Sequence, residues 1–291
     1  MFAIALESRQ YQTYVLSDGS QQTRLEVVPE RGGIATSWQV NGQEMFYLDT
    51  ERFKDPALSV RGGNPILFPI CGNLPDNTYT HNGQSYTLKQ HGFARELPWA
   101  VLDQQVAADS ARLTVGLTST EQTRVGYPFD FELAFTYILT AHALTLHQRY
   151  TNRSSEPMPF SAGFHPYFAI EDKAKLQLQI PANQYDDNVS KSVQAYAGGF
   201  DFGVDEIDAA FTEISSPVAS VTDAGRSQRL TLTFSPEFST IVFWTVKGKD
   251  FYCLEPWTAP RNAMNTGNHL LHLQPNQTLE LEMQLTVAPA A

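Results

Sequence analysis

Four short segments of the sequence place charged or polar residues beside glycine, proline and aromatic rings. They are "VRGGNPILFPICGNL" at 60–74, "KQHGFAR" at 89–95, "SAGFHPYFAI" at 161–170 and "CLEPWTAPRN" at 253–262. A sugar site needs aromatic rings that stack on a pyranose face and a few polar groups that hydrogen-bond to hydroxyls. The segments therefore indicate a binding site for a small-molecule carbohydrate.

Glu255 is the clearest candidate for a general base. It follows the apolar run "DFYCL" and precedes Pro256 and Trp257. A carboxyl group against so much apolar surface has a raised pKa unless it is paired, and a raised pKa suits a general base near neutral pH. The alternative is a structural ion pair with Arg261, and the sequence does not choose between the two.

Two histidines, His165 and His91, are candidates for proton transfer or hydrogen bonding. His165 lies between "GF" and Pro166, where a loop is expected to meet a strand. Gly92 follows His91 and predicts a tight turn that lets a ligand or another strand approach. Taken alone, each context is more typical of a structural histidine than of a site residue.

Arg61, Lys89 and Arg95 form a basic trio in an otherwise acidic chain. The sequence favours solvated or carboxylate-paired side chains. The alternative is an anion pocket, for example for the phosphate of a sugar phosphate.

The elements expected to position these segments are β-strands, because apolar residues recur at every second position. In "FDFELAFTYIL" the residues at 129, 131, 133, 135, 137 and 139 share one apolar face. The same pattern recurs at 112–118, 144–150, 175–180, 229–234 and 279–287. No stretch of 12 or more residues shows a capped amphipathic helix. The sequence predicts an all-β fold, a large antiparallel β-sandwich.

Turn signals stand between the predicted strands. "NGQ" at Asn41 and at Asn82, "SDGS" at Ser17 and "DAGR" at Asp223 are typical of hairpins. Two connections, about 50–98 and about 181–217, are too long and polar for hairpins, and long ordered loops are usually functional. With no linker or internal repeat, we expect one domain over residues 1–291.

Composition excludes several classes of protein. A net charge of −11 and a pI near 5.0 disfavour nucleic acid as a partner. We find no signal peptide and no apolar run of membrane-spanning length, so we expect a cytoplasmic protein without a membrane partner. Cys71 and Cys253 lie in apolar stretches typical of buried reduced thiols. No phosphate-binding P-loop, no G-x-S-x-G elbow and no zinc-ligand spacing at His269 and His272 are present, so no cofactor or metal is expected.

Taken in order, "GGNPILFPICG", "HGFAR", "GFHPYF" and "LEPWTAP" resemble motifs of the aldose 1-epimerase (galactose mutarotase-like) superfamily. The closest likeness is to its bacterial LacX-type branch, with a second likeness to hexose-6-phosphate mutarotases, which also carry Arg-Gly-Gly and H-G-F-A-R elements. The match spans about Arg61 to Arg261. It implies a β-supersandwich of galactose mutarotase type and an isomerase that interconverts the α and β anomers of an aldohexose without a cofactor.

The resemblance also implies catalytic roles. Glu255 corresponds to the general base, His165 to the general acid, and His91 to a substrate-binding histidine that assists at the ring oxygen. One base and one acid suffice to open the pyranose ring, and each proton transfer contributes roughly 10² to 10⁴-fold. We expect a carboxylate and a protonated imidazole to coexist near pH 7 because each stabilises the charge of the other.

Further residues are expected to bind the substrate. Arg61 corresponds to the family's arginine ahead of a P-x-x-x-P segment, and Asp208 in "DEIDAAF" resembles its sugar-binding aspartate, although Asp205 also fits. Trp257 and the phenylalanines of the motifs are candidates for a stacking platform. The expected substrate-binding set is Arg61, Asn64, Lys89, Arg95, Asp208 and Trp257.

Two departures bear on the substrate. Asn64 stands where many phosphate-sugar relatives carry an aliphatic residue, and "FPICG" lacks the tryptophan frequent in the hexose-6-phosphate branch, which weakens the phosphate interpretation; Arg95 is shared by both branches. Three hypotheses stay open: an epimerase of a free aldohexose, a hexose-6-phosphate mutarotase with Arg61, Lys89 and Arg95 as the phosphate clamp, and a non-catalytic carbohydrate-binding protein. Either a monomer or a homodimer is compatible with the sequence.

Overall fold

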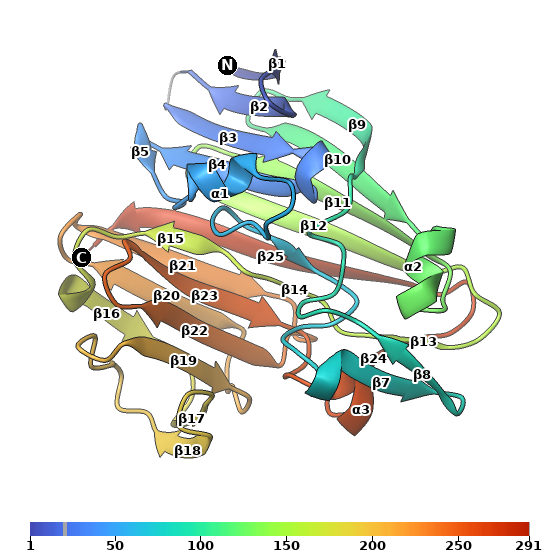
Figure 1. Cartoon of the computed structure of the whole chain (residues 1–291). Helices are drawn as coiled ribbons and strands as arrows, with labels where there is room; N and C mark the ends of the chain where they lie inside the picture. The colour runs from blue at the N-terminus through green and yellow to red at the C-terminus, as the bar shows by residue number, and fades with distance from the viewer. Residues whose placement is uncertain (20–21, 291) are drawn as a thin grey trace.

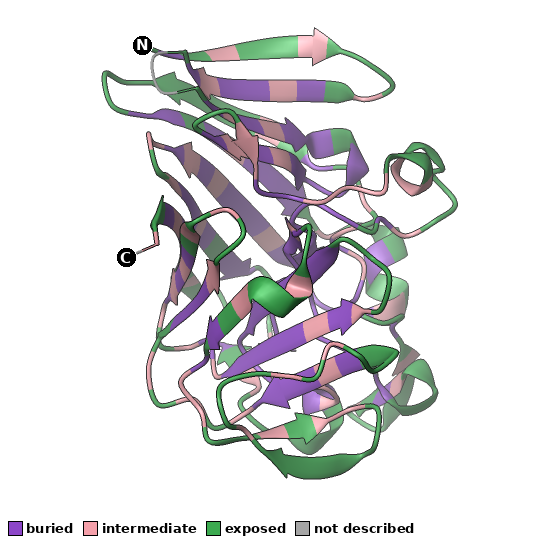
Figure 2. Cartoon of the chain, turned by 90° about the vertical axis from the view of Figure 1, so that its left-hand side faces the viewer, coloured by how far each residue is buried: buried purple, intermediate pink, exposed green. Residues whose placement is uncertain are grey.

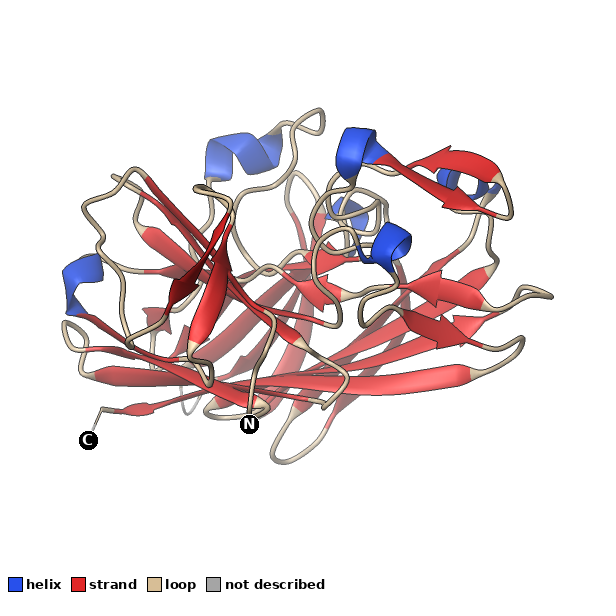
Figure 3. Ribbon diagram, turned by 90° about the horizontal axis from the view of Figure 1, so that it is seen from below, coloured by secondary structure: helices blue, strands red, loops and turns tan. Residues whose placement is uncertain are grey.

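A computed structural model describes residues 1–19 and 22–290. Its strands form three large sheets and two small two-stranded ones, and the paired strands run antiparallel (Figure 1). Viewed from below, the strands make up the body of the molecule and the helices are short turns at its margins (Figure 3). The all-β, antiparallel prediction is confirmed.

The first sheet is a meander of neighbouring strands at the N-terminus. The turn between its last two strands has Asn41 and Gly42 at φ 53° and 76°, the left-handed pair that a tight hairpin requires and that "NGQ" predicts. Part of "SDGS" lies outside the described residues. The strands, in sheet order, are β1 (Phe2–Ser8), β2 (Gln12–Asp18), β3 (Thr23–Val28), β4 (Ile34–Val40) and β5 (Gln43–Glu44).

The second sheet contains the strands with the strongest period-two pattern. In β11 the alternate residues from Phe131 to Leu139 are almost fully buried, as their spacing predicts. The hairpin of "DAGR" joins β20 and β21. The sheet order is β16 (Leu176–Gln179), β20 (Val218–Asp223), β21 (Gln228–Phe234), β25 (Thr278–Pro289), β12 (Ala143–Asn152), β11 (Phe131–Leu139), β10 (Ala111–Thr118) and β9 (Ala100–Val106).

The third sheet positions the candidate site. Its strand β23 pairs with β22 on one side and with both β14 and β15 on the other. The sheet order is β18 (Ser192–Ala195), β17 (Gln184–Asp187), β19 (Glu206–Phe211), β22 (Thr240–Val246), β23 (Phe251–Trp257), β14 (Gly163–Phe164) and β6 (Ile66–Leu67), with β15 (Tyr167–Ala169) beside β23.

Short elements complete the fold. The two-stranded sheets pair β13 (Met158–Phe160) with β24 (Leu271–Leu273) and β7 (Thr78–His81) with β8 (Gln84–Thr87). The α-helices are α1 (Thr50–Lys54), α2 (Glu121–Gly126) and α3 (Ala263–Thr266), and the 3₁₀ turns are η1 (Pro29–Arg31), η2 (Pro75–Asn77) and η3 (Lys173–Lys175). No helix in the described part of the chain is long and apolar enough to span a membrane.

The two long connections predicted from the sequence are not continuous loops. Residues 50–98 contain α1, β6 and the β7–β8 hairpin, and residues 181–217 contain β17, β18 and β19. Apart from β19, these strands have only two to four residues, too few to show the alternation that predicts a strand. The consequence matters for the site, because Asp208 lies on a regular strand.

One large hydrophobic cluster draws side chains from all three large sheets. Figure 2 shows the resulting alternation of buried and exposed residues along the strands. Three phenylalanines of the predicted motifs, Phe68, Phe164 and Phe168, belong to this cluster, and the half-buried Phe93 packs against it. None of the four lines the candidate cavity described below.

Candidate active site

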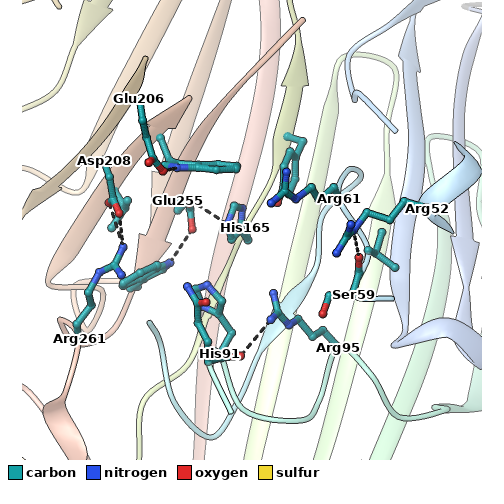
Figure 4. A pocket seen from close by; sticks show the side chains of 16 residues that line it. Arg52, Ser59, Arg61, His91, Arg95, His165, Glu206, Asp208, Glu255 and Arg261 are labelled. Carbon is teal, nitrogen blue, oxygen red and sulfur yellow. Dashed lines mark hydrogen bonds and ion pairs between the residues drawn. The ribbon is translucent and has the colours of Figure 1, made fainter. Parts of the chain in front are cut away.

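A cavity of about 360 Å³ opens beside the third sheet (Figure 4). Side chains from β19, β22 and β23 line one side, and the segments 52–61 and 90–95 line the other, with His165 between them. All four segments singled out in the sequence contribute to the lining. The fold therefore brings together residues that lie up to two hundred positions apart.

Glu255 occupies a position on β23 whose neighbours along the strand point into the main core. Tyr252 and Leu254 belong to the large hydrophobic cluster, so the alternate residues Glu255 and Trp257 face the cavity. The Glu255 side chain is only 1% exposed, and its Oε2 accepts a hydrogen bond from Trp257 Nε1 at 3.2 Å. Burial, reinforced by the negative charge of Asp208, raises the pKa of Glu255 well above its usual range.

The structural ion pair considered for Glu255 is absent from the described residues. Arg261 instead donates two hydrogen bonds to Asp208, at 3.0 Å to Oδ1 and 2.7 Å to Oδ2. The raised pKa predicted for an unpaired Glu255 is confirmed.

His165 lies between β14 and β15, at the loop-to-strand junction that the sequence predicts. Its backbone N–H donates to Pro65 O at 3.1 Å, and its ring stacks on Tyr167 with centroids 4.7 Å apart. Its Nε2 lies 3.5 Å from Glu255 Oε1. Burial, and then the charge of Arg95, lowers the pKa of His165 to about 3. The predicted protonated imidazole is therefore wrong for the free protein, in which His165 is neutral near pH 7.

Two hydrogen bonds with the backbone of Gly72 hold His91 in place, one at its backbone and one at its ring. Its own N–H donates to Gly72 O at 2.7 Å, and the Gly72 N–H donates to His91 Nδ1 at 3.1 Å. Because Nδ1 accepts, the proton of the neutral ring lies on Nε2. Burial, followed by the charges of Arg95 and His165, lowers the pKa of His91 well below its usual value. His91 is therefore a neutral N–H donor.

Gly92 makes this arrangement of His91 possible. Its φ is 68°, and a Cβ atom there would lie 2.2 Å from Phe68 O. Only glycine accommodates both the left-handed backbone and this approach. The close passage of a second strand, one of the two options predicted for Gly92, is what the structure contains.

The carboxylate side of the cavity consists of Glu206, Asp208 and Glu255. Register pairs Asp208 with Trp244, so the two side chains share one face of the sheet. Asp208 Oδ1 also accepts from Asn188 Nδ2 at 3.0 Å, and Glu206 accepts from Trp244 Nε1 at 2.7 Å. Each of these carboxylates thus has a donor that fixes it.

Asp205, the alternative to Asp208, is exposed and does not line the cavity. Trp257 is almost fully buried and lies edge-on to His91. The Arg261 guanidinium lies 5.9 Å from the centroid of the Trp257 ring. The aromatic surface that faces the cavity comes from Trp257, Trp244 and Tyr167.

The arginine side of the cavity consists of Arg52, Arg61 and Arg95. Arg52 Nε donates to Ser59 O at 2.7 Å, and Arg95 Nη2 donates to Gln90 O at 3.0 Å. Across the described residues, none of the three arginines forms an ion pair, although the chain has 31 acidic residues against 20 lysines and arginines. Burial lowers the pKa of Arg95, as expected for a guanidinium with little solvent around it.

Two residues of the expected binding set lie elsewhere. Lys89 is exposed and borders a separate depression beside α2, so the structure does not bring it to Arg61 and Arg95. Asn64 is fully buried behind the site, and its amide atoms have no hydrogen-bond partner among the described residues.

Several lining residues were not predicted as site residues: Arg52, Tyr167, Glu206 and Trp244. Glu206 had a usable signal, because it lies two positions before Asp208 and therefore on the same strand face. Tyr167 lies in "SAGFHPYFAI", one of the segments singled out for their aromatic rings, so its segment carried a signal although the residue itself was not named. Trp244 stands in an apolar strand and Arg52 in a polar segment, where no local pattern marks them.

The fold and the cavity define a class of protein, the galactose mutarotase-like β-sandwiches, to which solved structures of similar fold belong. The family model for aldose 1-epimerase matches residues 12–286, so the chain belongs to the aldose 1-epimerase family, a family of isomerases. The resemblance stated from the motifs is confirmed.

Solved structures support the same assignment. The protein Slr1438 of Synechocystis sp. PCC 6803 is 46% identical, with a TM-score of 0.95 over 99% of this chain and 100% of that one. A galactose mutarotase-like protein of Clostridium acetobutylicum is 20% identical, with a TM-score of 0.85 over 99% of each chain. The second likeness shows the fold alone.

Curated relatives match over shorter stretches. A protein of Cenchrus ciliaris, provisionally named a glucose-6-phosphate 1-epimerase, is 29% identical over 168 residues, or 54% of this chain and 48% of that protein. The chromosomal LacX protein of Lactococcus lactis subsp. lactis is 23% identical over 237 residues, or 72% of this chain and 78% of LacX. The chain thus spans about half the length of the glucose-6-phosphate relatives that it matches.

Proposed function

We propose that the protein is an aldose 1-epimerase that interconverts the α and β anomers of an aldohexose. The observation that carries the proposal is the contact between Glu255 Oε1 and His165 Nε2, 3.5 Å apart, in a cavity that both residues line. A general base and a general acid are thereby within reach of two neighbouring oxygens of one sugar. Membership in the aldose 1-epimerase family supports the reaction class.

The reaction needs two proton transfers. Glu255 removes the proton of the C1 hydroxyl while His165 delivers a proton to the ring oxygen, so that the C1–ring-oxygen bond breaks and an open aldehyde forms. Rotation about the C1–C2 bond then exposes either face of the aldehyde, and the reverse transfers close the ring. Each transfer contributes roughly 10² to 10⁴-fold.

The shifted pKa values fit this exchange, because Glu255 and His165 share one proton. The form with carboxylate and imidazolium is the one that starts ring opening, and the form with carboxyl and neutral imidazole is the one that results. Burial penalises charge, which lowers the pKa of His165 and raises that of Glu255. The buried site therefore favours the proton distribution that accompanies the open-chain sugar.

The neighbouring residues are suited to binding and orientation. The His91 Nε2–H donates toward the ring oxygen or a hydroxyl beside it, because Nδ1 is occupied by Gly72. Asp208 accepts hydrogen bonds from sugar hydroxyls on the carboxylate side. Trp257 and Trp244 provide apolar ring surface for the sugar.

The experiment that tests the proposal follows the exchange of pure anomers of glucose and galactose by polarimetry or by exchange NMR. We expect the protein to accelerate the interconversion well above the spontaneous rate. Saturable sugar binding without acceleration would overturn the proposal and would instead support a non-catalytic carbohydrate-binding protein.

A second candidate, a hexose-6-phosphate 1-epimerase, is favoured by the arginine side. In a pyranose the ring oxygen lies between C1 and C5, and C5 carries C6. Glu255 at the C1 hydroxyl and His165 at the ring oxygen would direct C6 away from Glu255. Figure 4 shows Arg61, Arg95 and Arg52 on that side of His165.

The guanidinium groups of the arginine side have no carboxylate partner among the described residues, so their charge is available to an anionic group. The partial match to proteins provisionally named glucose-6-phosphate 1-epimerases agrees with this candidate. Comparing kcat/KM for glucose and for glucose 6-phosphate separates it from the first. A higher value for the phosphate would support it, and equal values would exclude a dedicated phosphate subsite.

A further inference from the structure

A buried thiol lies beside the proposed acid and base. Cys253 precedes Glu255 by two positions on β23, so both side chains point to the same face of the strand. The ligand atoms of His165, Cys253 and Glu255 all lie within 4.8 Å of one another. Imidazole, thiolate and carboxylate are the three side-chain types that bind zinc in proteins.

From this triad we propose that His165, Cys253 and Glu255 form a binding site for Zn²⁺, and that the bound ion blocks the acid and the base. The inference adds a metal-dependent inhibition to the proposed function and rests on that function only for its effect on activity. The binding itself stands independently of the reaction.

The geometry is close to that of a tetrahedral zinc site. His165 Nε2 and Glu255 Oε1 are 3.5 Å apart. Two ligands with bonds of 2.0–2.1 Å at a tetrahedral angle are about 3.4 Å apart. The three ligand atoms form a triangle with sides of at most 4.8 Å. The centre of an equilateral triangle of that size lies about 2.8 Å from each atom, whereas zinc–ligand bonds are about 2.0–2.3 Å long. Shifts below about 1 Å would complete the coordination.

Charge makes the thiolate indispensable. Zinc with one thiolate, one carboxylate and one neutral imidazole is a neutral assembly, and a neutral assembly costs the least to bury. The cavity also contains the unpaired guanidinium groups of Arg61 and Arg95, which repel an uncompensated cation. Binding forms Zn–N, Zn–S and Zn–O bonds and releases two protons to solvent, the thiol proton of Cys253 and the proton that Glu255 and His165 share.

The cavity provides a path to the triad and a place for a fourth ligand. His165 and Glu255 line the cavity directly. Cys253 is fully buried and not part of the lining, and it is paired in register with two lining residues, Trp244 on β22 and Tyr167 on β15. An ion between the three therefore keeps one coordination position toward the cavity, open to water or to a sugar hydroxyl.

The chain offers a matched control, because its second cysteine is also buried and reduced. Cys71 is 1% exposed and Cys253 is fully buried, and both thiols are free. Cys71 belongs to no potential metal-binding group in the part of the chain that the structure describes. Cys71→Ser therefore changes a buried thiol without touching the triad.

The direct test uses Co²⁺ as a spectroscopic probe of chelator-treated full-length protein. We expect wild type and Cys71→Ser to show a thiolate-to-cobalt charge-transfer band that Zn²⁺ abolishes. We expect Cys253→Ser, checked for folding by circular dichroism, to lose the band. Its affinity for Co²⁺ should fall more than about 100-fold, because removing a residue that only hydrogen-bonds to a metal ligand costs about 10- to 100-fold. A wild type without the band, or a Cys253→Ser variant that keeps it, would overturn the proposal.

A second measurement links the site to the reaction. Mutarotation by wild type and by Cys71→Ser should fall on addition of Zn²⁺ and recover with EDTA, whereas the Cys253→Ser rate should not respond. If Zn²⁺ binds but the wild-type rate does not change, the inhibition is wrong. If the metal-free protein does not catalyse mutarotation, the proposed function fails, while the Co²⁺ spectrum still decides whether the metal site exists.

Discussion

The two sides of the cavity differ in how their charges are held. On the carboxylate side, Asp208 and Glu255 project from regular strands of one sheet, and each accepts a hydrogen bond from a neighbouring side chain. On the arginine side, Arg52 projects from the five-residue helix α1, and Arg61 and Arg95 project from irregular segments. Arg52 and Arg95 donate to carbonyl oxygens, which leave their positive charge uncompensated.

This difference indicates a division of work. Groups that transfer protons must hold their geometry within fractions of an ångström, and strands with side-chain hydrogen bonds provide that rigidity. Groups that attract an anion need charge and some freedom to adapt. We therefore assign the chemistry to the carboxylate side, with His165, and the selection of the substrate's charge to the arginine side.

The largest expected effect comes from removing the base. Glu255→Gln keeps the shape of the side chain and an oxygen for Trp257 Nε1, but the amide cannot accept the substrate proton. We expect kcat for anomer exchange to fall by roughly 10² to 10⁴-fold, measured by exchange NMR.

The control for this variant is Glu206→Gln, which changes a carboxylate in the same cavity that bonds to Trp244. Its effect on kcat should be much smaller. A Glu255→Gln variant with the wild-type rate would show that the carboxylate side does not perform the chemistry.

The sequence predicted the carboxylate side better than the arginine side, and the reason is physical. Period-two alternation in β11 and β25 follows from burial of one strand face, so the all-β class could be predicted. Glu255 could be predicted as well, because an ionisable group inside an apolar strand requires an explanation. Most strands of 50–98 and 181–217 were missed because two to four residues are too few to show an alternating pattern.

The arginine side depends on tertiary placement that no local pattern reports. Lys89 and Arg95 are six positions apart, yet only Arg95 reaches the cavity, because the chain turns at His91 and Gly92. Arg52 reaches it through the position of α1 and a hydrogen bond to Ser59 O. The sequence also could not predict the protonation state of His165, since it depends on burial beside Arg95.

The next effect in size tests the arginine side directly. Arg95→Gln removes a half-buried charge, and a hydrogen bond to a charged group is worth about 1.5–3 kcal/mol. If the substrate is a sugar phosphate, kcat/KM for glucose 6-phosphate should fall about 10- to 100-fold while kcat/KM for glucose changes little. Lys89→Gln is the matched control, because Lys89 lies outside the cavity and its loss should alter neither value. Equal losses for both sugars in Arg95→Gln would mean that the arginine does not distinguish charge.

A third prediction concerns His165, which lies between the two sides. Burial, and then Arg95, lowers its pKa to about 3, so the unfolded chain binds a proton below about pH 6.5 that the folded chain does not. Folding stability is therefore lost as the pH falls from about 6.5 toward 3, by about 2 kcal/mol between pH 7 and pH 5 from this group. Between pH 7 and pH 5, the free energy of unfolding should fall by about 2 kcal/mol less in His165→Gln than in the wild type. Urea unfolding at the two pH values measures this difference. His142→Gln, in the exposed β11–β12 turn, should follow the wild type, and an unchanged pH dependence in His165→Gln would show that His165 is not held neutral.

The smallest expected effect comes from Arg52. It shows whether the arginines of the arginine side contribute unequally to binding an anionic substrate. Arg52 and Arg95 are both half-buried, but the Nε of Arg52 is already engaged by Ser59 O, whereas the Nε of Arg95 has no partner among the described residues, so Arg52 offers an anion less. Contacts of partly exposed charges contribute about 0–1 kcal/mol, so Arg52→Gln should lower kcat/KM for glucose 6-phosphate by at most about fivefold and leave glucose unaffected. The loss should shrink further at high ionic strength, since salt screens exposed charges more than buried ones. A loss as large as that of Arg95→Gln would mean that the hydrogen bond to Ser59 O does not weaken the contact of Arg52 with an anion, and that α1 contributes as much to substrate selection as the segment around His91.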